Sequence, residues 1–347
     1  MKLTGIRAKA VRIYSEYRAI LIFLNRLSSE ERRGIDNTLK HLPHLSRSKI
    51  ISFIEKLTDE IGRLRREFGI TAKLKDFELF LNPEEFSLHP GKTLLISKHH
   101  LSQLIPRYEK VFPEFRDLPP HARIGIDTLG YEYPTPRYEV HLLEASLFED
   151  MASLWNSLAD LPPNIEDDPL SDINLFKRTK ALQRATIRSA FALIEGYLNG
   201  LAMDIYLTGE TTIKELEKLT ESDQTHGRPR QISLKDKISQ YPKIALSLPN
   251  PPITSSNCIE VVQLLDLETR VRHALIHPTP MARGPENSRQ WREETYFDVD
   301  RAQVADACRT ISDVILLIDK ILDGMFGTVG FWLYPLKSGR YPDGTFH

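Results

Sequence analysis

The feature that most constrains the fold is a long segment of helical periodicity from Arg184 to Leu207. Its apolar residues recur at three- and four-residue steps and form one wide face, as in a helix that packs on a core. They are Ile187, Ala190, Phe191, Ile194, Leu198, Leu201, Ala202 and Ile205. Start signals lie at residues 169–171 and a stop signal at Gly209, so we expect one helix that spans about 50 Å.

A second helix is expected to begin at Ser255 or Ser256, either of which is a suitable N-cap residue. Its apolar stripe consists of Cys258, Val261, Leu264, Leu267, Val271, Ala274 and Leu275. The helix closes on Arg272 and His277, and Pro278 follows at once. This Arg-His pair therefore lies at the C-terminal end of an apolar-periodic helix.

On an ideal helix, a separation of five residues rotates a side chain by about 140° net, so Arg272 and His277 would leave on opposite flanks. A proline disfavours the α conformation of the residue before it. We therefore expect the helix to fray at Ile276, which allows the two side chains to converge. The partial negative charge of a helix C-terminus also favours cations at this end.

Other helices in this half of the chain are indicated by capping patterns. Thr212 with Glu215 would open a short helix to Leu219, and Ser233 with Asp236 would open one to Tyr241. Asp300 with Gln303 would cap a final apolar-periodic helix that ends near Leu322. The C-terminal half is therefore expected to be a helical bundle.

Basic residues are concentrated in the first 75 residues, which hold 17 Lys or Arg against 8 Asp or Glu, a balance of +9 in a chain of net charge −1. Three helices are expected there, at Ile6–Leu27, Ser29–Leu42 and Ser46–Phe68. Their exposed positions are expected to include Arg32, Arg33, Arg63, Arg65 and Arg66. Such a surface could attract nucleic-acid phosphates, although a charged helix face is also explained by solvation alone.

Between these halves the pattern changes to short apolar runs. Candidate strands are Phe77–Leu81, Thr93–Ser97, Ile124–Leu129 and Tyr138–Leu142, with a helix at Leu101–Phe112. Helical periodicity returns at Val140–Leu161, and the acidic, proline-bearing residues 162–169 are typical of a linker. We therefore expect a mainly α protein with a small α+β insert.

The composition, 41% hydrophobic and 27% charged, is that of an ordinary globular protein. The apolar run Ala19–Leu24 is too short for a signal-peptide core or a membrane span. Cys258 and Cys308 are expected to be buried free thiols, and we expect a cytoplasmic protein without membrane contact. Gly91-Lys92-Thr93 lacks the upstream glycine of a phosphate loop, and His99-His100 lacks partners at metal-ligand spacing, so no cofactor or metal is expected.

The Arg272–His277 segment resembles the R-x4-6-H motif of HEPN-superfamily ribonucleases, with His273 at the polar position after the arginine. The segment Arg184–Leu207 resembles the long helix of the first hairpin of a HEPN domain. This resemblance covers about residues 170–326 and implies a C-terminal HEPN-like helical bundle. A basic helical region (1–72) and an α+β segment with its connecting helix (73–161) would precede it, and a tail (327–347) would follow.

The resemblance implies metal-independent RNA cleavage. His277 would act as general base or acid on the 2′-hydroxyl and the leaving oxygen, and Arg272 would stabilise charge on the scissile phosphate. His273 would orient Arg272 or contact the phosphate, although the family often has Asn or Asp there. Glu195 would be a partner that positions Arg272.

The family further implies a homodimer that brings two motifs face to face, and a role as a toxin or an antiviral abortive-infection effector with an antitoxin or another regulator. Two other hypotheses remain open. One is a non-catalytic HEPN-like module that binds RNA, nucleotide or a partner protein. The other is an interaction scaffold whose C-terminal helices simply dimerise. The motif itself could also be structural, with Arg272 bonding the last helix carbonyls and His277 capping them.

Overall fold

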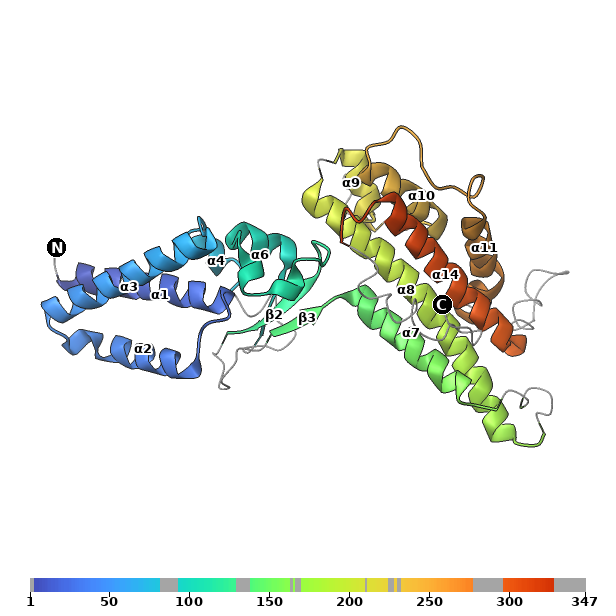
Figure 1. Cartoon of the computed structure of the whole chain (residues 1–347), viewed down its shortest axis with the longest axis horizontal. Helices are drawn as coiled ribbons and strands as arrows, with labels where there is room; N and C mark the ends of the chain where they lie inside the picture. Colours follow the sequence, from blue (N-terminus) through green and yellow to red (C-terminus); the bar gives the residue numbers. More distant parts are fainter. Residues whose placement is uncertain are drawn as a thin grey trace. The chain divides into compact units, whose positions relative to one another are not determined.

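A computed structural model describes residues 3–81, 93–128, 138–162, 165, 170–209, 211–223, 228–229, 232–276 and 296–327. The chain divides into two compact units, Met1–His141 and Leu142–His347. Helices dominate both units, and a small antiparallel sheet lies in the first (Figure 1). The predicted fold class, mainly α with a small α+β insert, is confirmed.

The first unit opens with three helices, α1 (Leu3–Phe23), α2 (Ser29–His41) and α3 (Arg47–Phe68). Serine caps start the second and third: Ser28 forms a capping box with Glu31, and the Ser46 hydroxyl accepts a bond from a backbone N–H of α3. Helices α1 and α3 pack side by side (Figure 1). The apolar run Ala19–Leu24 is buried at the end of α1, so core packing explains it.

The remainder of this unit surrounds a three-stranded antiparallel sheet in the order β1-β2-β3. The strands are β1 (Thr93–Ser97), β2 (Arg123–Asp127) and β3 (Tyr138–His141), with Leu95 opposite Gly125 and Ile124 opposite Val140. The helical elements are α4 (Leu74–Glu78), α6 (Lys98–Leu104) and the 3-10 turns η1 (Leu42–His44), η2 (Tyr108–Lys110) and η3 (Pro113–Phe115). Three of the four predicted strands are therefore present.

Two predictions for this region are wrong. Phe77–Leu81 is not a strand, because the Asp76 carboxylate accepts the Lys73 N–H at 2.7 Å and starts α4, which seats Phe77 in the core. The helix predicted at Leu101–Phe112 ends at Leu104, since Pro106 disfavours the helical conformation of the residue before it. The 3-10 turn η2 lies in the rest of the predicted range, and η3 follows it.

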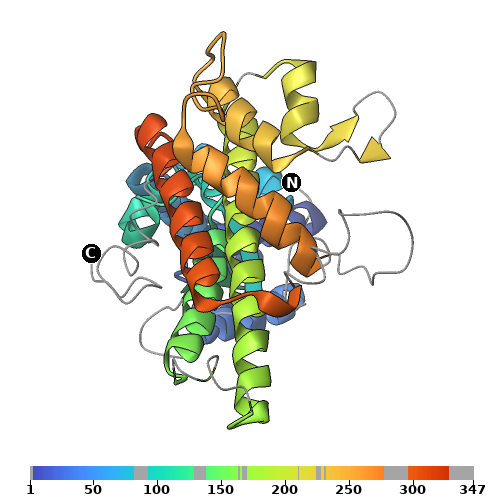
Figure 2. The same cartoon turned by 90° about the vertical axis from the view of Figure 1, so that its right-hand side faces the viewer.

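The second unit is built on α8 (Ile173–Thr208), a single helix of 36 residues. Its N-cap is Asp172 rather than a residue of 169–171, and Gly209 ends it as predicted. Helices α7 (Leu143–Ala159) and α14 (Arg301–Ile321) pack along it (Figure 2). A Cβ atom on Gly196 of α8 would overlap the Leu147 side chain of α7, so this glycine permits the close approach of the two helices.

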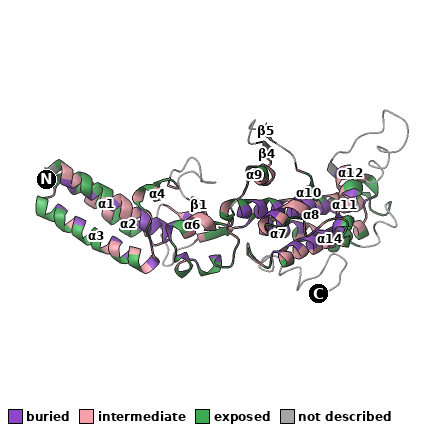
Figure 3. Cartoon of the chain, turned by 90° about the horizontal axis from the view of Figure 1, so that it is seen from above, coloured by how far each residue is buried: buried purple, intermediate pink, exposed green. Residues whose placement is uncertain are grey.

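The predicted connecting helix at Val140–Leu161 corresponds to α7 and belongs to the second unit, because it packs against α8. Smaller elements complete this unit: α9 (Ile213–Leu219), α10 (Leu234–Ala245) and the two-residue strands β4 (Ser222–Asp223) and β5 (Arg228–Pro229). The predicted side-chain caps at Thr212, Ser233 and Asp300 are all present. Buried residues follow the inner faces of α8, α10 and α14 (Figure 3).

Candidate functional site

The predicted motif lies on a helix whose backbone hydrogen bonding changes at the motif. Helix α11 (Ile259–Leu267) continues into a π-helical turn, η5 (Glu268–Arg272), and then into α12 (His273–Ile276). The N–H of His273 donates to the carbonyl of Glu268, five residues back instead of four. A single π turn inside an α-helix is frequent at functional sites.

The start of this helix differs from the prediction. Cys258 is the N-cap of α11, and neither Ser255 nor Ser256 serves as a cap. The Asn257 side chain instead accepts the Thr254 N–H at 2.7 Å, which closes a turn before the helix. The serine hydroxyls therefore precede the helix and do not start it.

Arg272, the last residue of the π turn, is held by carboxylates from two helices. Its Nη2 is paired with Glu195 of α8, and its Nη1 lies 2.9 Å from Oε1 of Glu268. The guanidinium carbon lies 5.5 Å from the centre of the Phe191 ring, within the range of a cation–π contact. The Arg272 side chain is only 18% exposed, so tertiary contacts fix its position.

The contact between Arg272 and Glu195 that the sequence predicted is present, whereas the catalytic role of either residue stays a prediction. One guanidinium faces two carboxylates, so its immediate surroundings carry a negative balance. Glu195 is 38% exposed and Glu268 is 16% exposed. Of the two partners, Glu195 can therefore be displaced by a ligand at the lower cost.

Two arginines of α8 also belong to this region, although they were not predicted as site residues. Nη2 of the exposed Arg188 donates to the carbonyl of Leu275 at 2.5 Å, at the end of the motif helix. One turn earlier, Arg184 stacks on Tyr296 at 4.6 Å and donates to its carbonyl at 3.5 Å. The spacing of 184, 188 and 195 on one helical face could have indicated this row.

The two histidines of the motif differ in what the structure describes. His273 is partly buried, directly after the π turn. His277 lies outside the described residues, as does the predicted convergence of its ring with Arg272. The described chain leaves α12 at Ile276, next to the carbonyl that Arg188 contacts, and resumes at Tyr296 against Arg184.

Other predicted groups lie apart from this cluster. Cys308 is a buried free thiol, and burial raises its pKa to about 12. Cys258 is free but only partly buried, and its thiol donates to Glu260 at 2.9 Å. His99 and His100 are partly buried at the start of α6, and burial lowers the pKa of each. Within the described ranges, no group of three or more His, Cys, Asp or Glu could hold a metal.

Comparisons with protein-family models, curated proteins and solved structures gave no match. Among the described residues, no helix is both long enough and apolar enough to cross a membrane.

Proposed function

We propose that the protein is a metal-independent endoribonuclease of HEPN type. The observation that carries the proposal is the contact of Arg272 with Glu195, which joins a π turn in the motif helix to the long helix α8. Functional arginines are usually held in place by neighbouring groups, because a flexible guanidinium would lose conformational entropy in each binding event. The exposed Arg188 adds a second cation at the same helix end.

In this proposal His277 moves the protons, taking one from the attacking 2′-hydroxyl and giving one to the leaving oxygen. Imidazole suits both steps because it titrates near neutral pH. Arg272 stabilises the charge that develops on the phosphate through paired N–H groups. RNA must displace Glu195 to reach Arg272, while Arg188 holds a neighbouring phosphate.

The resemblance extends the proposal to the assembly and its biological setting. A homodimer would place two motifs around one RNA, and an antitoxin or another regulator would restrain a toxin or an antiviral effector. Dimerisation is tested by sedimentation of the purified chain. A protein that stays monomeric at all concentrations and still cleaves RNA would contradict the dimeric site.

A second candidate function is a non-catalytic HEPN-like module that binds RNA, nucleotide or a partner protein. The observation that favours it is the pairing of Arg272 with two carboxylates, which is also the arrangement of a structural ion pair. Such a module would bind without cutting. A measurement of RNA integrity therefore distinguishes the two functions, whereas a measurement of RNA affinity does not.

The deciding experiment compares the wild type with His277→Ala and with a matched control, His44→Ala, whose ring lies in the exposed η1 turn of the first unit. RNA integrity is measured in cells and in buffer that contains EDTA. We expect cleavage by the wild type and by the control, and none by His277→Ala. Equal degradation by all three proteins, or intact RNA with all three, would exclude the ribonuclease.

A further inference from the structure

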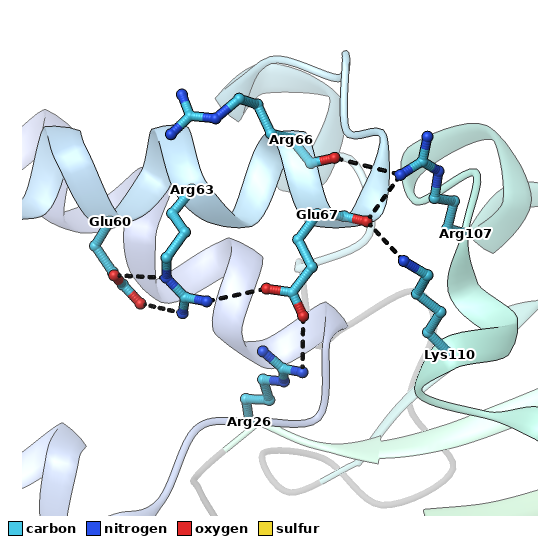
Figure 4. Close-up of polar contacts among 7 residues, drawn as sticks. All are labelled: Arg26, Glu60, Arg63, Arg66, Glu67, Arg107 and Lys110. Carbon is cyan, nitrogen blue, oxygen red and sulfur yellow. Dashed lines mark hydrogen bonds and ion pairs between the residues drawn. The ribbon is translucent and has the colours of Figure 1, made fainter.

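Cations from three segments of the first unit converge on the C-terminal end of α3 (Figure 4). The group consists of Arg26, Arg63, Arg66, Arg107 and Lys110, together with the carboxylates of Glu60 and Glu67. We call it the α3-end cluster. It contains five cations and two carboxylates, and all of its residues are described.

The two carboxylates are already matched by arginines. Glu60 receives two bonds from Arg63, at 3.0 and 2.6 Å. Glu67 lies between Arg63, at 3.0 Å, and Arg26, at 3.4 Å. The Arg26 guanidinium also lies 4.8 Å from the centre of the buried Phe68 ring, which fixes its position. These four side chains form a balanced network.

Among the residues that the structure describes, the other three cations form no ion pair with a carboxylate. Nη1 of Arg107 lies 3.2 Å from the backbone carbonyl oxygen of Glu67, and Nζ of Lys110 lies 3.3 Å from the same oxygen. One carbonyl therefore draws two full positive charges close together. The exposed Arg66 lies on the last turn of α3, and its carbonyl accepts a bond from Arg107 at 3.5 Å. Its guanidinium points back along α3 toward Gly62, away from Arg107 and Lys110, and makes no side-chain hydrogen bond with a described residue (Figure 4).

The charge of the helix end does not balance these cations. A helix C-terminus carries about half a negative charge, whereas Arg66, Arg107 and Lys110 carry three positive charges. Glu109 adjoins Lys110 in sequence, but the two form no ion pair in the described part of the chain. The α3-end cluster thus keeps an excess of positive charge, with N–H donors that face solvent.

We propose that Arg66, Arg107 and Lys110 bind phosphate groups of an RNA backbone. Two guanidiniums and an ammonium provide fork-shaped and point-charge donors, a set that suits phosphate oxygens. Successive phosphates along a strand can engage neighbouring cations, and the release of counterions favours the complex. The choice of RNA as the polyanion rests on the proposed function, whereas the phosphate contact does not.

The test uses the full chain with His277→Ala, so that the RNA stays intact during the measurement. Binding of a short single-stranded RNA is followed by fluorescence anisotropy at several salt concentrations. Each phosphate contact contributes about 0.7 to the slope of log K against log salt for a single strand. We expect Arg66→Gln, Arg107→Gln and Lys110→Gln together to lower the magnitude of that slope by about 2.

The control protein loses three exposed cations elsewhere in the same unit, through Lys40→Gln, Arg47→Gln and Lys49→Gln. It has the same net charge as the triple variant, and we expect it to keep the wild-type slope. Because Arg107 and Lys110 also contact the end of α3, Arg66→Gln alone provides a variant that removes no described hydrogen bond. It should lower the slope by about 0.7.

Equal slopes for the triple variant and the control would overturn the proposal. So would binding to vesicles of acidic lipid in the absence of RNA binding. A DNA strand of the same sequence shows whether the 2′-hydroxyl contributes, and equal RNA and DNA slopes are expected for contacts to phosphate alone. RNA that is bound through these residues but never cut by the wild type would overturn the proposed ribonuclease and leave this inference standing.

Discussion

The α3-end cluster and the arginine of the motif helix have opposite electrostatic surroundings. At the α3-end cluster five cations meet two carboxylates, and at Arg272 one cation meets two carboxylates. The first arrangement leaves positive charge available to a ligand at once. At Arg272 a ligand would first have to displace a carboxylate, and we call Arg272 with Glu195 and Glu268 the restrained site. An arginine can therefore be open to a ligand in one unit and covered by carboxylates in the other.

Replacement of Arg272 gives the largest expected effect and tests whether the restrained site is catalytic. Arg272→Ala should reduce RNA cleavage by at least about 100-fold, because a donor to the developing phosphate charge is lost. Initial cleavage rates measure the change. The control is Arg270→Ala, two residues away, since Arg270 is 73% exposed and its ion pair among the described residues is with Asp266. Equal loss in both variants would assign the effect to the helix and not to Arg272.

Two arginines of α3 test how far burial changes the contribution of an arginine to the free energy of unfolding. Arg65 is 24% exposed, pairs with Glu16 at 2.8 Å and donates to the carbonyls of Ile70 and Ala72. Arg65→Met should lower the free energy of unfolding by about 2 kcal/mol, because a carboxylate and two carbonyls lose their donor. Arg63→Met, at an exposed position, should cost less. Urea denaturation measures both, and a reversed order would contradict the argument from burial.

Removal of the Glu195 charge should shift the balance of charge around Arg272 toward that of the α3-end cluster. In the His277→Ala background, Glu195→Gln should tighten RNA binding about fivefold, since a like charge about 4 Å from a phosphate costs about 1 kcal/mol in water. Affinity is measured at fixed salt, with the exposed Glu149→Gln of α7 as the charge-matched control. Weaker binding would mean that Glu195 positions Arg272 and does not restrain it.

Local chemistry explains which parts of the fold could be predicted. The caps at Thr212, Ser233 and Asp300 depend on residues three apart, so the sequence alone indicates where those helices start. Phe77–Leu81 has four apolar residues out of five, a short run that is typical of a strand. The ring of Phe77 packs 5.1 Å from that of Phe23, more than 50 residues earlier, and no local pattern records this contact.

Tertiary contacts also limited what could be predicted for the exposed arginines and for the candidate site. Arg33, Arg63 and Arg66 are exposed as predicted, whereas Arg32 and Arg65 are partly buried. Arg65 is held by Glu16 of α1 and by the carbonyls of Ile70 and Ala72. The contact of Arg272 with Glu195 followed from the resemblance of two segments. The π turn did not, because it inserts one backbone residue without a sequence signature and is visible only in the bond from His273 to Glu268.

The direction in which the Arg272 side chain points depends on that π turn. A regular α-helix with the same number of residues would turn everything after residue 272 by about 100° from its present orientation relative to α11 and would point the guanidinium away from α8. Loss of one residue, such as Thr269, would restore regular hydrogen bonding and keep the present orientation, because the π turn accommodates one extra residue. Chains of this kind should therefore tolerate a deletion at position 269 better than a deletion within α11, where no extra residue is present.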